Sequence, residues 1–357
     1  MSLPAVGEFV SSAHACPVCE GHDLRIVSHV GRHYQALTTA ICTGCGLVQN
    51  YPLPSDEELA NYYRKQYRSD YKSAYTPKKK HILRYANAAM ARMKRLRPFL
   101  SSSEIKLLDI GSGSGEFIYA AKLAGFDVTG IEPHEGYSNY TRETFDVPVL
   151  TANYQTAEVA EESVDVITLH HVLEHLRQPL EAILHMRRWL KPGGLIMIDV
   201  PDIEHTQHSP VNRFHYAHLY NFNHDTLKAL LKKAGFEPVD APANRQGTVL
   251  AARKTAMPAP QMAYVMTENY DRLWTLLMQG SEAAQYKQKR PVLRFLGKCW
   301  RYPQEILQAC WIGAPRQIVR HKFQALMTLL VFLTAPFEFS GVSEGERKRH
   351  FLSQHIS

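Results

Sequence analysis

The sequence predicts an α/β fold: a parallel sheet with helices on both faces, preceded by a cysteine-rich unit and followed by a helical extension. Three observations predict this fold. Between residues 105 and 252, short apolar runs alternate with helical patterns of about ten residues. Two Cys-x-x-Cys pairs lie upstream of these runs. Beyond Ala256, the pattern changes to helical segments with aromatic and basic residues.

Each expected element of the central part has a local signal. The strands are short, mostly apolar runs, and turn residues or helix-starting residues separate them. We expect strands at Ile105–Ile110, Asp127–Ile131, Val147–Leu150, Val164–His170, Leu195–Val200, Glu237–Asp240 and Thr248–Ala252. We expect helices at 81–100, Glu116–Ala124, Glu135–Thr144, Pro179–Leu190 and Thr226–Ala234. The last two strands should form a hairpin at the sheet edge, which a nicotinamide-binding sheet would not have.

The N-terminal unit, residues 14–50, is built around Cys16, Cys19, Cys42 and Cys45. Four thiolates in two such pairs suit a tetrahedral zinc ion in a closed, structural site. The 22 residues between the pairs slightly exceed the usual zinc-ribbon spacing of about 15–20, and a hairpin can absorb the difference. A redox dithiol is the alternative, but a redox pair needs no second pair. The sequence therefore favours a structural zinc ribbon.

Residues 51–100 are expected to form a helical linker or lid. Pro52-Leu53-Pro54 ends the ribbon, and Ser55-Asp56-Glu57-Glu58 marks a helix start with an acidic first turn. The next stretch is dense in tyrosine, with Tyr62, Tyr63, Tyr67, Tyr71 and Tyr75. A lid that lines the substrate, or packing of the ribbon against the central domain, would each explain these residues.

Charge is unevenly distributed along the 357 residues. Residues 1–252 are near neutral, whereas residues 253–357 hold 15 Lys and Arg against 7 Asp and Glu. This tail indicates an acidic partner (a membrane surface, a phosphorylated carrier or nucleic acid) or a solvated helical surface. The N-terminus shows no secretory signal, and six cysteines without one favour a reducing compartment. We expect a cytoplasmic protein, with peripheral contact at the inner face of the membrane as a further expectation.

The C-terminal extension, residues 255–357, contains the longest apolar stretch, Ala325–Phe337. Its 13 residues fall short of the roughly 17–25 that span a bilayer. It would either lie in a membrane interface, with residues 316–322 as its charged end, or form the core helix of a C-terminal bundle.

A glycine-rich loop follows the first strand of the central part. The run Leu107–Phe117 has the order of a buried strand, a tight loop and a helix N-terminus aimed at a ligand. Nicotinamide enzymes use a similar loop, so the loop alone does not select the cofactor. After the next strand, Glu132 is placed to hold a ribose diol.

These motifs resemble those of class I S-adenosylmethionine-dependent methyltransferases, and most of all a bacterial branch with an N-terminal zinc ribbon that acts on sugars and natural products. The resemblance covers residues 14–254 and is carried by Cys16–Cys19, Cys42–Leu47, Asp109–Gly115, His171–Leu176 and Leu190–Gly194. It implies a Rossmann-like methyltransferase sheet at 101–254, with seven strands of which the last is antiparallel. It also implies S-adenosylmethionine as the cofactor and structural zinc at the four cysteines.

The resemblance also implies which residues hold the cofactor. Asp109 would face the ammonium of the methionine half, and N–H groups of the loop and helix start would take its carboxylate. Glycines in the loop would keep space for this approach, and Glu132 would accept two ribose hydroxyl groups. The predicted set is Asp109, Gly111, Ser112, Gly113, Gly115, Glu132, Pro133, Asn153, Tyr154 and His170, with Asn153 and Tyr154 at the adenine. The structural alternative for Asp109 and Glu132 is a pair of strand-end acids with satisfied hydrogen bonds.

The first histidine segment, His170–Leu176, directly follows the fourth strand. Methyl transfer needs an aligned acceptor and, for a hydroxyl, a base that titrates near neutral pH, for which histidine is suited. His171 is expected to line the methyl pocket. Glu174 and His175 would take part with it or, as the structural alternative, cap and orient the loop.

The second histidine segment, Arg213–Phe222, follows the fifth strand and resembles a loop of sugar C-methyltransferases. His218 matches the histidine of that loop, but Ala217 stands at its glutamate and His215 at its tyrosine. This departure disfavours C-methylation of a keto sugar. It leaves His218 as the candidate base for O- or N-methylation, with His171 and His215 as further catalytic candidates. The alternative for His218 is a buried structural histidine.

The sequence thus predicts a methyltransferase acting on a hydroxyl of a sugar, a lipid-linked glycan or a related small molecule, as in polysaccharide or natural-product assembly. An RNA methyltransferase is one alternative. It is disfavoured because residues 1–252 are not basic and no Asn/Asp-Pro-Pro-Tyr/Phe motif follows the fourth strand, so we expect no nucleic-acid partner. A non-catalytic S-adenosylmethionine-binding module is the other alternative.

Overall fold

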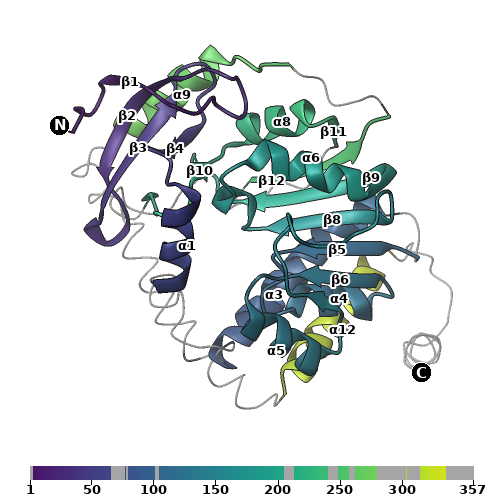
Figure 1. The fold of residues 1–357 in the computed structure, drawn as a ribbon. Helices are drawn as coiled ribbons and strands as arrows, with labels where there is room; N and C mark the ends of the chain where they lie inside the picture. Colours follow the sequence, from purple (N-terminus) through teal and green to yellow (C-terminus); the bar gives the residue numbers. More distant parts are fainter. Residues whose placement is uncertain are drawn as a thin grey trace, which may run out of the picture.

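A computed structural model of the chain describes residues 3–65, 77, 79–100, 104–204, 213–239, 248–256, 262–279, 303 and 314–334. Two sheets dominate it. Figure 1 shows a smaller sheet on one side of the molecule and a larger sheet, covered by helices, on the other. The predicted α/β fold class is confirmed.

The larger sheet has seven strands in the order β11-β12-β9-β8-β5-β6-β7. They are β5 (Lys106–Ile110), β6 (Asp127–Ile131), β7 (Val149–Leu150), β8 (Val164–His170), β9 (Leu190–Val200), β11 (Phe236–Val239) and β12 (Thr248–Lys254). Strands β5 to β9 pair in parallel, and β12 is antiparallel to both β9 and β11. The last strand is therefore antiparallel, as predicted. Strand β9 begins before Leu195 because Leu190 already pairs with Val164.

Helices cover both faces of this sheet. Successive strand residues point to opposite faces, so Leu107 and Leu108 enter two different cores. Leu107 packs in the core of α3, α4, α5 and α12, and Leu108 in the core of α6, α8 and part of the smaller sheet. The helices are α1 (Asp56–Lys65), α3 (Lys79–Leu96), α4 (Glu116–Leu123), α5 (Glu135–Phe145), α6 (Pro179–Trp189), α8 (His224–Lys233), α9 (Thr267–Gln279) and α12 (Pro315–Thr334), with short 3-10 helices η1 (Arg32–Tyr34), η2 (Arg97–Phe99) and η3 (Leu173–His175).

The smaller sheet, in the order β1-β2-β3-β4-β10, together with the two cysteine pairs forms what we call the ribbon unit. Its strands are β1 (Phe9–Ser11), β2 (Asp23–Val30), β3 (Ala36–Cys42), β4 (Val48–Asn50) and β10 (Tyr220–Asn221). Strand β10 comes from the second histidine segment, so the central region completes the N-terminal sheet. Helix α9 also packs on this sheet, where Leu273 and Leu277 lie buried with Ile41 and Val48. Segments from three parts of the sequence therefore build the ribbon unit.

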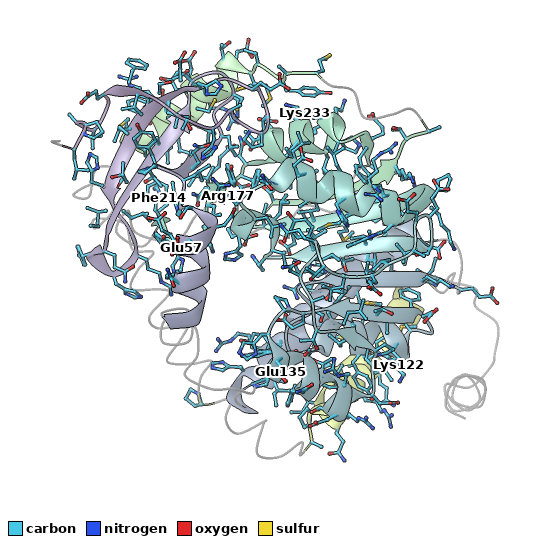
Figure 2. All side chains as sticks on the ribbon, viewed as in Figure 1. Glu57, Lys122, Glu135, Arg177, Phe214 and Lys233 are labelled. Carbon is cyan, nitrogen blue, oxygen red and sulfur yellow. The ribbon has the colours of Figure 1, made fainter. Side chains whose placement is uncertain are left out.

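Two side chains labelled in Figure 2, Arg177 and Lys233, lie where the ribbon unit meets the rest of the molecule. The Arg177 Nε donates to the carbonyl of Pro54 at 3.0 Å. Buried Lys233 pairs with Glu20 at 2.8 Å. Of the tyrosine-rich stretch, buried Tyr62 packs against Tyr216 of the second histidine segment, with ring centroids 4.8 Å apart. Tyr67, Tyr71 and Tyr75 lie outside the described residues.

Helix α12 packs on helices of the central part. Its Ile318 and Val319 are fully buried in the core of α3 and α4, and Arg320 donates to the Tyr119 hydroxyl at 3.5 Å. The two predicted alternatives, an interfacial helix and the core helix of a C-terminal bundle, do not include this packing. The residues of α12 that are buried against α3 and α4 begin at Ile318, upstream of the apolar stretch that starts at Ala325. Among the described residues, no helix combines the length and the apolar character needed to cross a membrane. Residues 335–357 lie outside the described part.

Candidate cofactor and acceptor site

The glycine-rich loop joins the end of β5 to the start of α4. Its N–H groups at Gly111 and Ser112 donate to the carbonyl of Ile131 at the end of β6, at 2.7 and 3.1 Å. All three glycines have positive φ, a conformation that favours glycine. Their surroundings differ, however. A Cβ on Gly111 would lie 2.6 Å from Val172, and a Cβ on Gly115 would lie 2.3 Å from Thr141.

Only at Gly113, among these three, would a Cβ meet open space, with its nearest atom 3.9 Å away. From the sequence, all three glycines are expected to keep space for the cofactor. The structure instead gives Gly111 and Gly115 a packing role against the protein's own side chains. Gly113 is therefore the position where the loop backbone has space beside it for the close approach of a ligand.

Glu132 ties this loop to the end of β6. Its Oε2 accepts from the Gly113 N–H and its Oε1 from the His134 N–H, both at 2.9 Å. Burial raises the pKa of Glu132, and these two backbone hydrogen bonds oppose that rise. Each carboxylate oxygen retains further acceptor capacity for a hydroxyl. Pro133 follows it at the loop that leads into α5.

Asp109 is buried at the end of β5 and accepts a 2.6 Å hydrogen bond from the Thr168 hydroxyl. Burial raises the pKa of Asp109 to about 7, and the Thr168 hydrogen bond and the charge of Arg92 limit the rise. An ammonium group bound beside Asp109 would therefore lower the pKa of this carboxyl and favour its ionised form.

The two predicted adenine-side residues differ in their surroundings. Asn153 is exposed after β7, and its side-chain oxygen accepts from the N–H groups of Gln155 and Thr156. Its amide nitrogen is a donor of the kind that a base edge accepts. Tyr154 is buried and packs edge-on against His185 of α6. Its ring is therefore part of the hydrophobic core that includes α6, and it anchors the loop there.

A buried charge cluster near the loop has no counterpart in the sequence analysis. Asp199, at the end of β9, pairs with Arg95 of α3 at 3.3 Å and lies 3.9 Å from His170. Burial lowers the pKa of Arg92, whose charge interacts with Asp199, Asp109 and Glu116. The signal available in the sequence was the position of Asp199 at a strand end, which parallels that of Asp109. The arginines carry no such signal, because they lie within an ordinary helical pattern.

His170 is buried at the end of β8, and its ring packs edge-on against Phe117 of α4. Burial and the nearby arginines hold the pKa of His170 well below its usual value, so the ring is neutral. It is therefore suited to packing against a neutral ligand surface rather than to binding a charge.

His171 turns the chain out of the sheet with φ 58°, and its N–H donates to the Asp199 carbonyl at 2.8 Å. Its side chain is half exposed, and its Nδ1 lies 3.5 Å from Oε1 of buried Glu174. Burial acts to lower the pKa of His171, but its contact with Glu174 outweighs this effect and raises it. An exposed imidazole oriented by a buried carboxylate is an arrangement suited to accepting a proton.

The second histidine segment folds back onto the first. The His175 ring contacts the Ala217 carbonyl through Nδ1 at 2.7 Å and lies edge-on to the His218 ring at 4.9 Å. His215 is buried, and its Nδ1 accepts from the Ala217 N–H at 3.0 Å. Burial lowers the pKa of His218 to about 3, so this ring is neutral and a weak base. The fold thus brings His171, His175, His215 and His218 into one region beside the cofactor loop.

The four cysteines of the ribbon unit meet in one buried cluster. The sulfurs of Cys16 and Cys45 lie 3.5 Å apart, and those of Cys19 and Cys42 lie 3.3 Å apart. All four sulfurs lie within 4.8 Å of one another, as four thiolates around one tetrahedral zinc ion would. A Cβ on Gly44 would lie 2.9 Å from the Cys19 sulfur. The donor set and its packing fit a closed zinc site.

Fold and site together give an α/β domain with a glycine-rich loop at the strand ends and, beside it, a group of histidines. Comparison with known proteins narrows this class. Residues 81–241 match a family described as a methyltransferase domain. A probable S-adenosylmethionine-dependent methyltransferase of Mycobacterium tuberculosis is 28% identical over 150 residues, covering 41% of this chain and 53% of that protein.

A ubiquinone biosynthesis O-methyltransferase of Actinobacillus pleuropneumoniae is 32% identical over 101 residues, covering 26% of this chain and 43% of that protein. The chain thus spans about half the length of the curated relatives it matches. Among solved structures, a 1,6-didemethyltoxoflavin-N1-methyltransferase of Burkholderia thailandensis, with S-adenosylhomocysteine bound, has a TM-score of 0.43 at 19% identity and covers 63% of this chain and 99% of that one. Part of this chain is thus similar in sequence to S-adenosylmethionine-dependent methyltransferases.

Proposed function

We propose that this chain is an S-adenosylmethionine-dependent methyltransferase that methylates a hydroxyl group of a sugar, a glycan or a related small molecule. The observation that carries the proposal is the Glu132 carboxylate, which holds the glycine loop through the Gly113 N–H at 2.9 Å. Beside it, the side of Gly113 that a Cβ would occupy is open. A ribose-binding acid and an open loop backbone at adjoining strand ends suit a nucleoside cofactor with a charged tail.

The residues that would hold the cofactor are those of the loop and of the neighbouring strand ends. Glu132 would accept the ribose hydroxyl groups, the loop N–H groups and the start of α4 would hold the carboxylate, and Asp109 would meet the ammonium. Asn153 would donate to the adenine. When bound, S-adenosylmethionine supplies an electrophilic methyl group on a sulfonium sulfur.

The acceptor side needs orientation and a place for the hydroxyl proton. His171 is our choice for the base, ahead of His218 and His215. Its ring is half exposed, and Glu174 faces its Nδ1, which leaves Nε2 to accept the proton. His218 is a weaker choice because its low pKa makes it a poor proton acceptor. His215 is also less suited, because its Nδ1 already accepts a backbone hydrogen bond.

The acceptor class rests on the resemblance of the two histidine segments to sugar and natural-product methyltransferases. A hydroxyl acceptor agrees with an O-methyltransferase among the relatives, whereas a structural neighbour bears the name of an N-methyltransferase. We further propose that the four cysteines bind a structural zinc ion, which would hold the ribbon unit beside the acceptor region. A basic tail would favour a phosphate-bearing, lipid-linked acceptor.

Calorimetric binding of S-adenosylmethionine and of NAD to zinc-quantified protein tests the cofactor. We expect micromolar binding of S-adenosylmethionine alone, and at least tenfold weaker binding in Glu132→Ala. Glu135→Ala is the control, because it removes a carboxylate three residues further along the chain, in the first turn of α5. NAD binding, or unchanged affinity in Glu132→Ala, would overturn the assignment. Nucleotide sugars and lipid-linked glycans would then be screened as methyl acceptors.

A further inference from the structure

Glu174, His175 and His218 form a cluster with the composition of a metal centre. Each residue offers one ligand atom, and these atoms lie within 4.8 Å of one another. Two of the residues come from η3, after β8, and the third comes from the second histidine segment. The cluster is separate from the four cysteines, which belong to the ribbon unit.

The buried Glu174 carboxylate has histidine neighbours but no hydrogen bond, since its Oε1 lies 3.5 Å from His171 Nδ1 and 3.8 Å from His175 Nε2. Glu174 is 1% exposed, and neither of its oxygens has a hydrogen-bond partner among the described residues. An ionised carboxylate without hydrogen bonds is strongly disfavoured in a protein interior unless a positive charge compensates it. The nearest atom of His175, Nε2, lies 3.8 Å from Oε1. Ligand atoms about 2.1 Å from a tetrahedral ion lie roughly 3.4 Å apart, so this spacing leaves room for an ion.

The orientation of His175 points to the same conclusion. Its Nδ1 lies 2.7 Å from the Ala217 carbonyl, so Nδ1 carries the proton and donates it. Nε2 therefore faces Oε1 of Glu174 across 3.8 Å, a gap too long for a hydrogen bond and wide enough for a metal ion between the two atoms. Metal-binding histidines commonly donate their other nitrogen to a backbone carbonyl in this way.

We propose that Glu174, His175 and His218 bind a divalent transition-metal ion, such as Zn²⁺, at the acceptor side of the site. Two imidazoles and one carboxylate leave coordination positions open, as in catalytic rather than structural zinc sites. The cluster lies beside the cofactor loop, because Val172 of the same turn is the residue that a Cβ on Gly111 would strike.

The open positions suggest a substrate class, and this step rests on the proposed methyltransferase function. An oxygen that binds a divalent ion loses its proton more readily. An acceptor hydroxyl with a second oxygen on a neighbouring carbon could occupy two open positions and be oriented by them. In the transfer, the hydroxyl oxygen forms a bond to the methyl carbon as the carbon–sulfur bond breaks toward sulfur. The hydroxyl proton leaves to His171.

A cobalt titration of the full chain, with zinc already bound at one ion per chain, tests the metal site. We expect one Co²⁺ to bind per chain with weak visible absorption and without the intense near-ultraviolet absorption that thiolate ligands give. Glu174→Gln and His218→Ala should each weaken Co²⁺ binding at least tenfold. His224→Ala is the matched control because His224 is exposed at the start of α8, and it should bind Co²⁺ as the wild type does.

Two results would overturn the site: no Co²⁺ bound beyond the four-cysteine site in the wild type, or equal binding in all variants. The first result would mean that the histidine contacts of Glu174 suffice without a metal ion. Melting curves without added metal check that the variants fold, and Glu174→Gln preserves the side-chain shape. S-adenosylmethionine binding is measured on the same samples. Its failure would remove the proposed function and leave the cobalt result standing, so the two proposals fail separately.

Discussion

At the scale of single residues, the glycines of the loop meet two different requirements that look alike in the sequence: close packing against a side chain at Gly115, and space beside the backbone at Gly113. Gly115→Ala would place a Cβ 2.3 Å from Thr141 at φ +84°, so we expect it to destabilise the fold by more than the roughly 1–2 kcal/mol of left-handed strain alone. Gly125→Ala measures that strain, because its φ is +89° and nothing lies within 4 Å of the added Cβ. Urea unfolding of the two variants gives the comparison, and equal losses would contradict the clash.

Gly113→Ala should behave differently from Gly115→Ala. Its Cβ would meet no atom closer than 3.9 Å, so we expect a stability loss similar to that of Gly125→Ala. The Cβ would nevertheless occupy the space beside the loop backbone, so affinity for S-adenosylmethionine should fall at least tenfold in calorimetry. Gly125→Ala is again the control and should bind normally. Full affinity in Gly113→Ala would show that the cofactor binds elsewhere.

Asp109 makes stability depend on pH with a definite sign. Burial raises its pKa to about 7 in the folded state, against an unfolded value of about 3.9. The folded protein therefore binds a proton more tightly than the unfolded chain, so stability falls as the pH rises from about 4 to 7. Asp109→Asn keeps a neutral amide there and should gain on the wild type by up to about 2.7 kcal/mol between pH 5 and pH 8, since each pH unit below the folded pKa is worth about 1.36 kcal/mol. Parallel unfolding free energies over that range would contradict the assignment.

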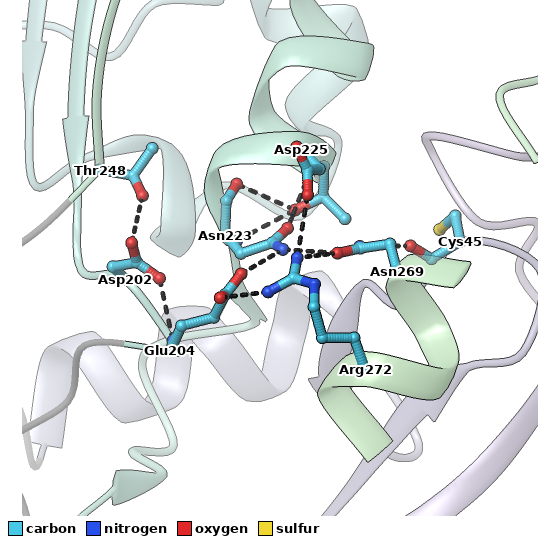
Figure 3. Close-up of polar contacts among 9 residues, drawn as sticks. Cys45, Asp202, Glu204, Asn223, Asp225, Thr248, Asn269 and Arg272 are labelled. Atoms are coloured by element: carbon cyan, nitrogen blue, oxygen red, sulfur yellow. Dashed lines mark hydrogen bonds and ion pairs between the residues drawn. The ribbon is translucent and has the colours of Figure 1, made fainter. Parts of the chain in front are cut away.

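At the scale of elements, α9 connects the ribbon unit to the central part of the chain through hydrogen bonds. Buried Asn269 donates to the Cys45 carbonyl at 2.8 Å and accepts from Asn223, the N-cap of α8, at 2.8 Å (Figure 3). Arg272 adds ion pairs to Glu204 and to Asp225 in the same network. One side chain of α9 thus joins a cysteine knuckle to a helix of the central part.

Asn269→Ala should therefore weaken the cysteine site without touching a cysteine. It leaves the buried amide of Asn223 and the Cys45 carbonyl each short of a partner, which typically destabilises a protein by about 1–3 kcal/mol. We expect faster zinc release to a chelator and a lower melting temperature. Glu268→Ala, at the exposed neighbour, should release zinc at the wild-type rate. Equal rates in the two variants would show that α9 does not stabilise the cysteine site.

Elements with strong local signals could be predicted from the sequence, and those made by distant pairing could not. The seven strands of the larger sheet each had a local signal, so their number and the final hairpin could be predicted, whereas their order in the sheet was not predicted. Strand β10 has two residues and exists because Tyr220 pairs with Gln49, which no local pattern indicates. Glu132 and the cysteines were visible because strand ends and Cys-x-x-Cys spacing fix their positions. Arg92 and Arg95 were not, because only tertiary packing turns one face of α3 toward Asp199.

At the scale of the whole molecule, α12 completes a core that begins more than two hundred residues earlier. Ile318 and Val319 are 1% and 0% exposed and pack with α3 and α4. A helix from a basic tail thereby becomes part of the larger domain, although Ala325 and Gln324 on its other side are exposed. The positive charge of this segment is partly engaged as well, since Arg316 donates to the carbonyl of Thr144 in α5.

Ile318→Ala tests whether α12 belongs to the cooperative core. Removing a buried isoleucine side chain from a packed core typically destabilises a protein by about 2–5 kcal/mol. We expect that loss in a single unfolding transition, because α12 shares its core with Leu107 of β5 and Ile82 of α3. Gln324→Ala, on the exposed face of the same helix, should stay within about 0.5 kcal/mol of the wild type. If Ile318→Ala also left the unfolding free energy unchanged, α12 would be a docked tail that detaches before the domain unfolds, and its charge would then be free to meet an acidic surface.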